Sequence, residues 1–155
     1  MEIVKITTKS EIETEHIGKV FAKNLVAGDI VAMYGDLGSG KTEFVKGICD
    51  YFEVEEIITS PTFTIVNKYT SSVAGKESLS IYHIDLYRIE KETELNEIGF
   101  QEYLNDENAI TLIEWAEKTT QIPPQAIKIT IKSDQEEDNV RYFEFELPRK
   151  FEFGV

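Results

Sequence analysis

A glycine-rich motif restricts the fold of this chain more than any other feature of its sequence. Residues Gly35 to Thr42 read Gly-Asp-Leu-Gly-Ser-Gly-Lys-Thr, which matches the G-x-x-x-x-G-K-[ST] pattern of phosphate-binding loops. The apolar run Ile30 to Tyr34 comes directly before it, as expected of a strand that leads through such a loop into a helix. This context favours a phosphate-binding loop over the alternative, a glycine-rich turn with only a structural use.

The motif contains the residue types that bind nucleotide phosphates and magnesium. Glycines let backbone N–H groups converge on phosphate oxygens, and the dipole of the following helix adds positive potential. The Lys41 ammonium would reach the outer phosphates, and the Thr42 hydroxyl would face magnesium. The predicted nucleotide contacts are Asp36, Leu37, Gly38, Ser39, Gly40, Lys41, Thr42 and, further along the chain, Thr62.

Length and charge restrict the domain organisation and the partners. The chain has 155 residues, enough for a sheet with covering helices but too few for a separate substrate domain, so we expect one domain over residues 1–155. Its formal net charge is -13, whereas a surface that grips nucleic acid by its phosphates is basic. Autonomous nucleic-acid binding is therefore not expected.

The acidic runs 53–56 and 134–138 are typical of solvated loops, with a docking surface for a basic partner as the alternative.

Three further features predict a cytoplasmic protein. No apolar run approaches the roughly 20 residues that a membrane helix needs. Residues 1–15 are polar and acidic, unlike a signal segment. Cys49 is the single cysteine, and the pattern places it in the helix after the glycine-rich motif, so neither a disulfide framework nor a thiolate metal site is expected.

Hydrophobic periodicity predicts strands that alternate with helices. The expected strands span 2–7, 30–34, 79–86, 109–113, 126–132 and 140–147, and the expected helices span about 10–25, 43–52 and 92–104. Residues 109–113 are apolar except for Thr111, as expected of a parallel strand buried on both faces. We therefore predict a single-domain α/β fold like that of P-loop NTPases, with a mixed sheet, helices on both faces and a C-terminal antiparallel hairpin.

An acidic residue follows the apolar strand 109–113. Glu114 would stand at the carboxyl end of that strand, where open α/β sheets bind their ligands. Glu114 and Thr42 would then approach one metal ion, directly or through water. The alternative is a carboxylate at the rim with no ligand. Trp115, the next residue, either packs against the sheet edge, gates water or contacts a partner.

A second group of polar residues lies in the segment 82–88. Strand alternation puts His83, Asp85 and Tyr87 on one face, and Arg88 follows at once. Asp85 would orient water or hold magnesium through its hydration shell, and Arg88 would bind phosphate or pair with an acid. In the structural alternative, His83 and Asp85 bond only to each other and Tyr87 is a core aromatic.

Two threonines form the third feature. Thr62 and Thr64 follow the helix after the glycine-rich motif, where many nucleotide switches place a hydroxyl that senses the terminal phosphate and magnesium. A turn formed by Ser60-Pro61-Thr62 explains the same residues without a ligand.

Together these segments resemble the TsaE family, also called YjeE, the bacterial ATPases of tRNA threonylcarbamoyladenosine biosynthesis. The resemblance covers most of the chain. It rests on Gly28-Asp29, the motif Gly35 to Thr42, Ser60-Pro61-Thr62-Phe63-Thr64, His83-Ile84-Asp85-Leu86-Tyr87-Arg88 and Glu114-Trp115-Ala116-Glu117-Lys118. The family often has proline where this chain has Ala116, and the residues from Arg141 onward match loosely. Neither departure is expected to touch the nucleotide site.

The resemblance implies a small ATPase that binds ATP and Mg²⁺ and assists a complex of two partners, TsaB and TsaD. Its implied catalytic residues are Lys41, Asp85 and Glu114, and its implied metal ligands are Thr42, Asp85 and Glu114. The partners would hold the tRNA and carry out the transfer, and ATP hydrolysis would reset the complex between turnovers.

Two other functions use the same loop. A small-molecule kinase would need several arginines to clamp a second substrate, and only Arg88, Arg141 and Arg149 occur. A nucleotide-dependent assembly module would need ATP binding but not hydrolysis, and the sequence leaves this alternative open. Arg88 is the candidate within the chain for an arginine finger, so slow turnover that a partner stimulates is the favoured prediction.

Overall fold

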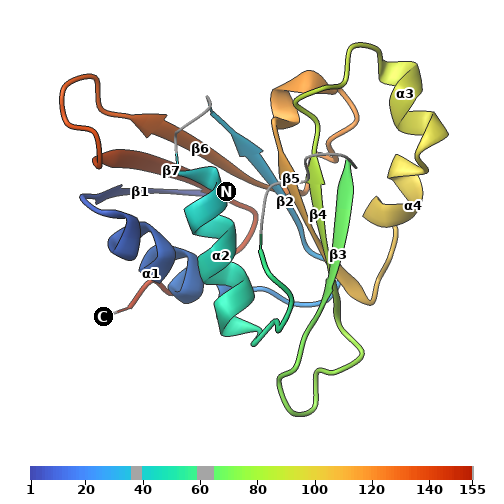
Figure 1. The fold of residues 1–155 in the computed structure, drawn as a ribbon, viewed down its shortest axis with the longest axis horizontal. Helices are drawn as coiled ribbons and strands as arrows, with labels where there is room; N and C mark the ends of the chain where they lie inside the picture. Colours follow the sequence, from blue (N-terminus) through green and yellow to red (C-terminus); the bar gives the residue numbers. More distant parts are fainter. Residues whose placement is uncertain (36–39, 59–64, 155) are drawn as a thin grey trace.

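In the computed structural model, residues 1–35, 40–58 and 65–154 are described, and within them the chain forms one seven-stranded sheet with helices on both faces (Figure 1). The strands are β1 (Glu2–Thr8), β2 (Ile30–Tyr34), β3 (Val66–Thr70), β4 (Ser80–Asp85), β5 (Ala109–Glu114), β6 (Ile127–Ser133) and β7 (Arg141–Leu147). The helices are α1 (Glu11–Ala22), α2 (Lys41–Tyr51), α3 (Glu92–Glu97) and α4 (Phe100–Leu104), with a 3₁₀ turn η1 (Ala116–Lys118). No helix in these ranges is long and apolar enough to cross a membrane.

The sheet has a parallel centre and antiparallel edges. Its strand order is β1-β7-β6-β2-β5-β4-β3. The four central strands, β6, β2, β5 and β4, are parallel. At one edge β7 pairs antiparallel with β6 and β1 pairs antiparallel with β7, and at the other edge β3 pairs antiparallel with β4. The predicted mixed sheet and the C-terminal hairpin are thus confirmed. The carboxyl ends of β2, β4 and β5 lie at one edge, where ligands of α/β sheets bind.

Strand alternation divides the core into two layers. Val31 and Met33 belong to the layer under α1 and α2, whereas Ile30 and Ala32 belong to the layer under α3 and α4. Every residue of β5 is buried, which confirms the prediction from its apolar run. Cys49 faces the first layer, and its burial, helped by the charge of Glu56, raises the pKa of the thiol to about 12.

The predicted helix over 92–104 is wrong in one respect, because it is two short helices. Gly99 has a φ of 74°, in the left-handed region that glycine adopts without steric cost, and it separates α3 from α4. The break lets Leu95 and Phe100 both enter the second core layer. Elsewhere the boundaries shift by a few residues, as for α1, which ends at Ala22.

Two glycines bring α1 and α2 into backbone contact. A Cβ atom on Gly18 would lie 2.3 Å from the carbonyl oxygen of Phe44, and one on Gly47 would lie 2.0 Å from the carbonyl oxygen of Glu15. Any side chain at these positions would force the helices apart. The contact fixes α2, and therefore the residues at its amino end, against the rest of the first layer.

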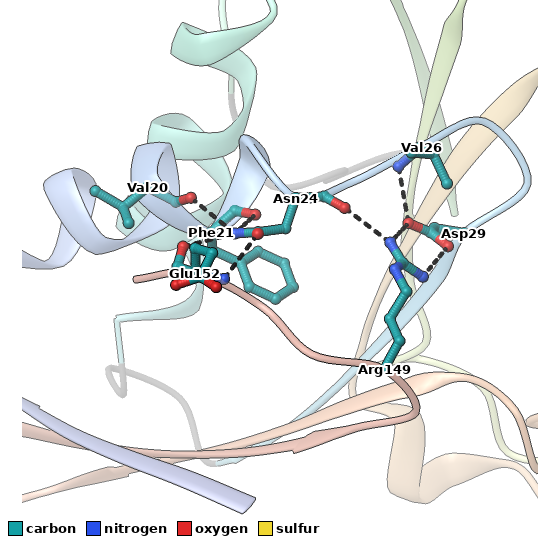
Figure 2. Close-up of polar contacts among 7 residues, drawn as sticks. All are labelled: Val20, Phe21, Asn24, Val26, Asp29, Arg149 and Glu152. Atoms are coloured by element: carbon teal, nitrogen blue, oxygen red, sulfur yellow. Dashed lines mark hydrogen bonds and ion pairs between the residues drawn. The ribbon is translucent and has the colours of Figure 1, made fainter. Parts of the chain in front are cut away.

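The C-terminal segment is fastened to the loop that precedes β2 (Figure 2). Arg149 donates two hydrogen bonds to the Asp29 carboxylate, at 2.9 and 2.7 Å, and a third to the carbonyl oxygen of Asn24. Asp29 also accepts from the N–H of Val26, and the Asn24 amide exchanges hydrogen bonds with the backbone of Glu152. Asp29 thus has a structural role: its carboxylate fixes the start of β2.

We expect Gly47→Ala to destabilise the protein by about 2 kcal/mol or more, because the gain in helix propensity is at most about 1 kcal/mol and the clash with Glu15 cannot relax without moving a backbone. Chemical denaturation measures the change. Gly154→Ala, which meets no atom within 4 Å, should change the free energy of unfolding by less than about 0.5 kcal/mol. A stabilised Gly47→Ala variant would contradict the close helix contact.

Candidate functional site

The glycine-rich motif joins β2 to α2, as the sequence predicts. Gly40 has a φ of 97°, and α2 begins at the next residue, Lys41, so that Lys41 and Thr42 occupy the first turn of the helix. N–H groups at the start of a helix point outward without intrahelical partners, and they favour anions. The other predicted nucleotide contacts, Asp36, Leu37, Gly38, Ser39 and Thr62, lie outside the described residues, as does Thr64.

The Lys41 side chain is buried, with 5% exposure, and its ammonium has specific neighbours. Nζ donates a hydrogen bond of 2.5 Å to the carbonyl oxygen of Gly35 and lies 3.9 Å from the centroid of the Trp115 ring. Such a cation–π contact is worth up to about 2 kcal/mol when it is shielded from water. Trp115 therefore contacts the lysine of the phosphate-loop motif instead of only packing against the sheet edge.

Trp115 has an unusual backbone conformation that places its ring there. Its φ is 59°, which non-glycine residues seldom adopt and which costs about 1–3 kcal/mol. The ring also packs on Tyr87, with centroids 5.0 Å apart. Tyr87 lies beyond the end of β4 and is 46% exposed, so the alternative in which Tyr87 is a core aromatic is wrong. Positive φ values of this kind concentrate at binding sites.

Two carboxylates stand side by side at the ends of neighbouring parallel strands. Asp85 and Glu114 are register partners, the last residues of β4 and β5. Burial raises the pKa of Asp85, and the charge of Glu114 raises it further, while the N–H of Tyr87 and the positive charge of Lys41 oppose the shift. The structure thus brings Lys41, Asp85 and Glu114 together at one edge of the sheet.

The donor set suits magnesium bound with a phosphate ligand. In the described ranges no group of three or more His, Cys, Asp or Glu side chains is arranged to hold a metal. Asp85, Glu114 and the Thr42 hydroxyl would supply only part of an octahedral shell. Mg²⁺ usually keeps several waters and takes one or two carboxylates together with substrate phosphates, so the residues fit that ion.

Glu114 is held by a buried histidine. The Nε2 atom of His83 lies 2.5 Å from Oε2 of Glu114, and both side chains are almost fully buried. Because a carboxylate accepts, Nε2 carries the proton of this bond. On the other side of the ring, Nδ1 lies 3.4 Å from the Tyr69 hydroxyl. The expected alternative, a bond between His83 and Asp85 alone, is not what the structure has, because the parallel register points His83 at Glu114.

Two residues near the motif were not predicted as site residues. Glu117 accepts a hydrogen bond of 3.4 Å from the N–H of Gly35. Arg141, at the start of β7, covers Gly40, because a Cβ atom on that glycine would lie 3.5 Å from both Cγ and Nε of the arginine. The expectation that the residues from Arg141 onward avoid the site is therefore wrong at this residue.

Arg88, the predicted arginine finger, is exposed in the turn after β4.

Known proteins share this architecture and much of this sequence. The sequence profile of the family "Threonylcarbamoyl adenosine biosynthesis protein TsaE" matches residues 8–142. The tRNA threonylcarbamoyladenosine biosynthesis protein TsaE of Bacillus subtilis is 38% identical over 133 residues, which cover 85% of this chain and 79% of that protein. The protein of the same name from Rickettsia typhi is 40% identical over 128 residues, which cover 81% of this chain and 84% of that protein.

A solved structure gives the same result for the fold. The crystal structure of YdiB from Bacillus subtilis superposes with a TM-score of 0.75 at 31% identity, covering 93% of this chain and 84% of that one. Because it covers 93% of this chain, the likeness is not confined to the phosphate-loop motif.

A double-mutant cycle tests the His83–Glu114 pair. His83→Ala should cost about 3–5 kcal/mol of unfolding free energy, because it leaves a buried carboxylate without its partner. The double variant with Glu114→Ala should then be more stable than the sum of the single changes predicts, by more than about 1 kcal/mol. The same cycle on the exposed pair Lys5–Glu144 should give a coupling of about 1 kcal/mol or less. Additive effects at His83 and Glu114 would contradict the pairing.

Proposed function

Because this chain belongs to the TsaE family of threonylcarbamoyl adenosine biosynthesis proteins, we propose that it binds ATP with Mg²⁺ and hydrolyses it in the service of that tRNA modification. One observation carries the proposal. The ammonium of the phosphate-loop lysine, Lys41, lies at the amino end of α2 beside the paired carboxylates Asp85 and Glu114. This arrangement supports the proposal because a cation suited to phosphate oxygens and two carboxylates suited to a metal ion lie at the same edge of the sheet.

In this proposal, the charge of each site residue determines whether it contacts phosphate or the metal ion. Lys41 would exchange its bond to the Gly35 carbonyl for one to the outer phosphates, so that its charge stabilises the transition state. Thr42, Asp85 and Glu114 would hold Mg²⁺, directly or through water, with Glu114 oriented by His83. The metal supplies charge neutralisation on the phosphate oxygens when it is bound. Asp85, whose pKa is raised by burial, would also orient the attacking water.

The reaction itself is a simple displacement. The water oxygen forms a bond to the terminal phosphorus, the bond from that phosphorus to the bridging oxygen breaks, and ADP, inorganic phosphate and a proton are released. None of the four glutamines of the chain, at 101, 121, 125 and 135, belongs to the site described above. Slow turnover by the isolated chain is therefore part of the proposal, with stimulation by a partner.

We propose that these partners are the proteins TsaB and TsaD, which would hold the tRNA and carry out the transfer. The net charge of -13 supports this division, because an acidic protein that repels tRNA can still dock on protein surfaces. Hydrolysis would reset the complex between rounds, in the cytoplasm.

Phosphate release from ATP and Mg²⁺ tests the proposal, with the chain alone and with TsaB and TsaD added. Lys41→Ala should weaken ATP binding at least tenfold, because it removes the buried ammonium. Glu114→Gln, which keeps an oxygen acceptor for His83, should slow release at least tenfold and change ATP affinity less than threefold.

Matched controls separate these effects from general loss of charge. Lys46→Ala alters an exposed lysine of the same helix, and Glu107→Ala alters an exposed glutamate before β5. Both should behave like the unmodified chain. ATP binding with no release under any condition would favour a nucleotide-dependent assembly module, and absence of ATP binding would overturn the proposal.

A further inference from the structure

A row of polar side chains crosses the first core layer, from the edge of the sheet to Glu114. Tyr69 lies in that layer among apolar neighbours such as Ile81 and Leu112. Because the side chains of a strand alternate between its faces, His83 of β4 and Glu114 of β5 lie on the same face as Tyr69 of β3. β3 is the edge strand, and β4 lies between it and β5, so the row joins three neighbouring strands (Figure 1).

The imidazole of His83 is held at both of its nitrogens, away from water. The exposed fraction is 3% for Tyr69, 0% for His83 and 3% for Glu114. The Tyr69 hydroxyl lies 3.4 Å from Nδ1 of His83, and Nε2 of the same ring lies 2.5 Å from Oε2 of Glu114. A hydroxyl both donates and accepts, so it satisfies Nδ1 whether or not that nitrogen carries a proton.

The edge strand also fixes the phenol that contacts His83. Nδ2 of Asn67 donates a hydrogen bond of 3.4 Å to the Tyr69 hydroxyl, and Asn67 is the register partner of His83 in the β3–β4 pair. The rings of Tyr69 and His83 are tilted toward each other, with centroids 6.1 Å apart. A strand that carries none of the predicted metal ligands thus supplies the contacts on one side of the imidazole.

Packing of the core does not require the Tyr69 hydroxyl. A phenylalanine ring would fill nearly the same volume, and the layer already contains Phe44 and Phe52. A buried hydroxyl is costly unless it is hydrogen-bonded, whereas a fully bonded polar network makes a core rigid. The hydroxyl therefore contributes through its contact with His83.

We propose that Tyr69 is a positioning residue of the metal site. It acts through His83: the phenol fixes the rotation of the imidazole, and the imidazole holds the Glu114 carboxylate in one orientation at the end of β5. The inference rests on the proposed function, because it presumes that Glu114 binds Mg²⁺ with the nucleotide. Partners that orient metal ligands commonly change affinity or activity about 10–100-fold when they are removed, and Tyr69 is one contact further from the metal, so we expect a smaller effect.

Tyr69→Phe tests the proposal, because it removes only the hydroxyl. In the chain without nucleotide or metal, nuclear magnetic resonance should show shifts of the Nδ1 nitrogen of His83 and of the proton on Nε2. His16, the other histidine, is exposed, and His16→Gln assigns the signals. Tyr82→Phe is the matched control, because it removes a hydroxyl that bonds to Asp106 at 2.8 Å on the other face of β4. Neither His83 resonance should change in that variant.

The phosphate-release assay gives the second readout. Tyr69→Phe should lower kcat at least about threefold and change the KM for ATP less than about twofold, because it leaves Lys41 and the phosphate contacts intact. On the background of His83→Gln, which removes the intermediate ring, Tyr69→Phe should lower kcat less than about 1.5-fold. Tyr82→Phe should change neither constant.

The outcomes separate this inference from the proposed function. If the unmodified chain is active, unchanged kcat and unchanged His83 resonances in Tyr69→Phe would overturn the inference, and so would equal losses with and without the His83 substitution. If Tyr69→Phe does not fold, the unmodified chain decides, because a resonance typical of an Nδ1 without a hydrogen bond would overturn the contact. An unmodified chain that releases no phosphate with or without partners would overturn the proposed hydrolysis, while the resonances still report whether Tyr69 holds the imidazole.

Discussion

Burial of the Lys41 ammonium requires compensating groups around it, and much of the site consists of those groups. A charge taken out of water costs several kcal/mol unless it is paired or hydrogen-bonded. The Gly35 carbonyl and the Trp115 ring contact the ammonium, and the charge of Lys41 is felt at Asp85. Trp115, whose ring lies over the ammonium, has a left-handed backbone conformation.

The fold keeps these groups in register. Parallel pairing of β4 with β5 places Asp85 beside Glu114, and the same pairing carries His83 within hydrogen-bond distance of Glu114. The close contact between α1 and α2 at Gly18 and Gly47 fixes α2, the helix from which Lys41 projects. The acids and the lysine thus sit on separate elements: strand pairing positions the acids, and helix packing positions the lysine.

The sequence predicted those features that depend on local pattern. The apolar run of β5, the strand–loop–helix motif and the alternating C-terminal hairpin each follow from neighbouring residues, and each is present. The division of one expected helix at Gly99 was not predicted, because Leu95 and Phe100 continue a helical apolar pattern and only the shape of the core layer requires the break. Contacts between distant strands were also beyond local pattern. Neither the His83–Glu114 bond nor the approach of Arg141 to Gly40 follows from spacing along the chain.

We propose that the edge formed by Lys41, Asp85 and Glu114 is a site for a nucleotide and magnesium. A crystal structure of the chain with Mg²⁺ and a non-hydrolysable ATP analogue tests it most directly. We expect Nζ of Lys41 to contact a phosphate oxygen and the Thr42 hydroxyl and the two carboxylates to hold the metal, directly or through water. An analogue bound elsewhere, with Lys41 still on the Gly35 carbonyl, would contradict it.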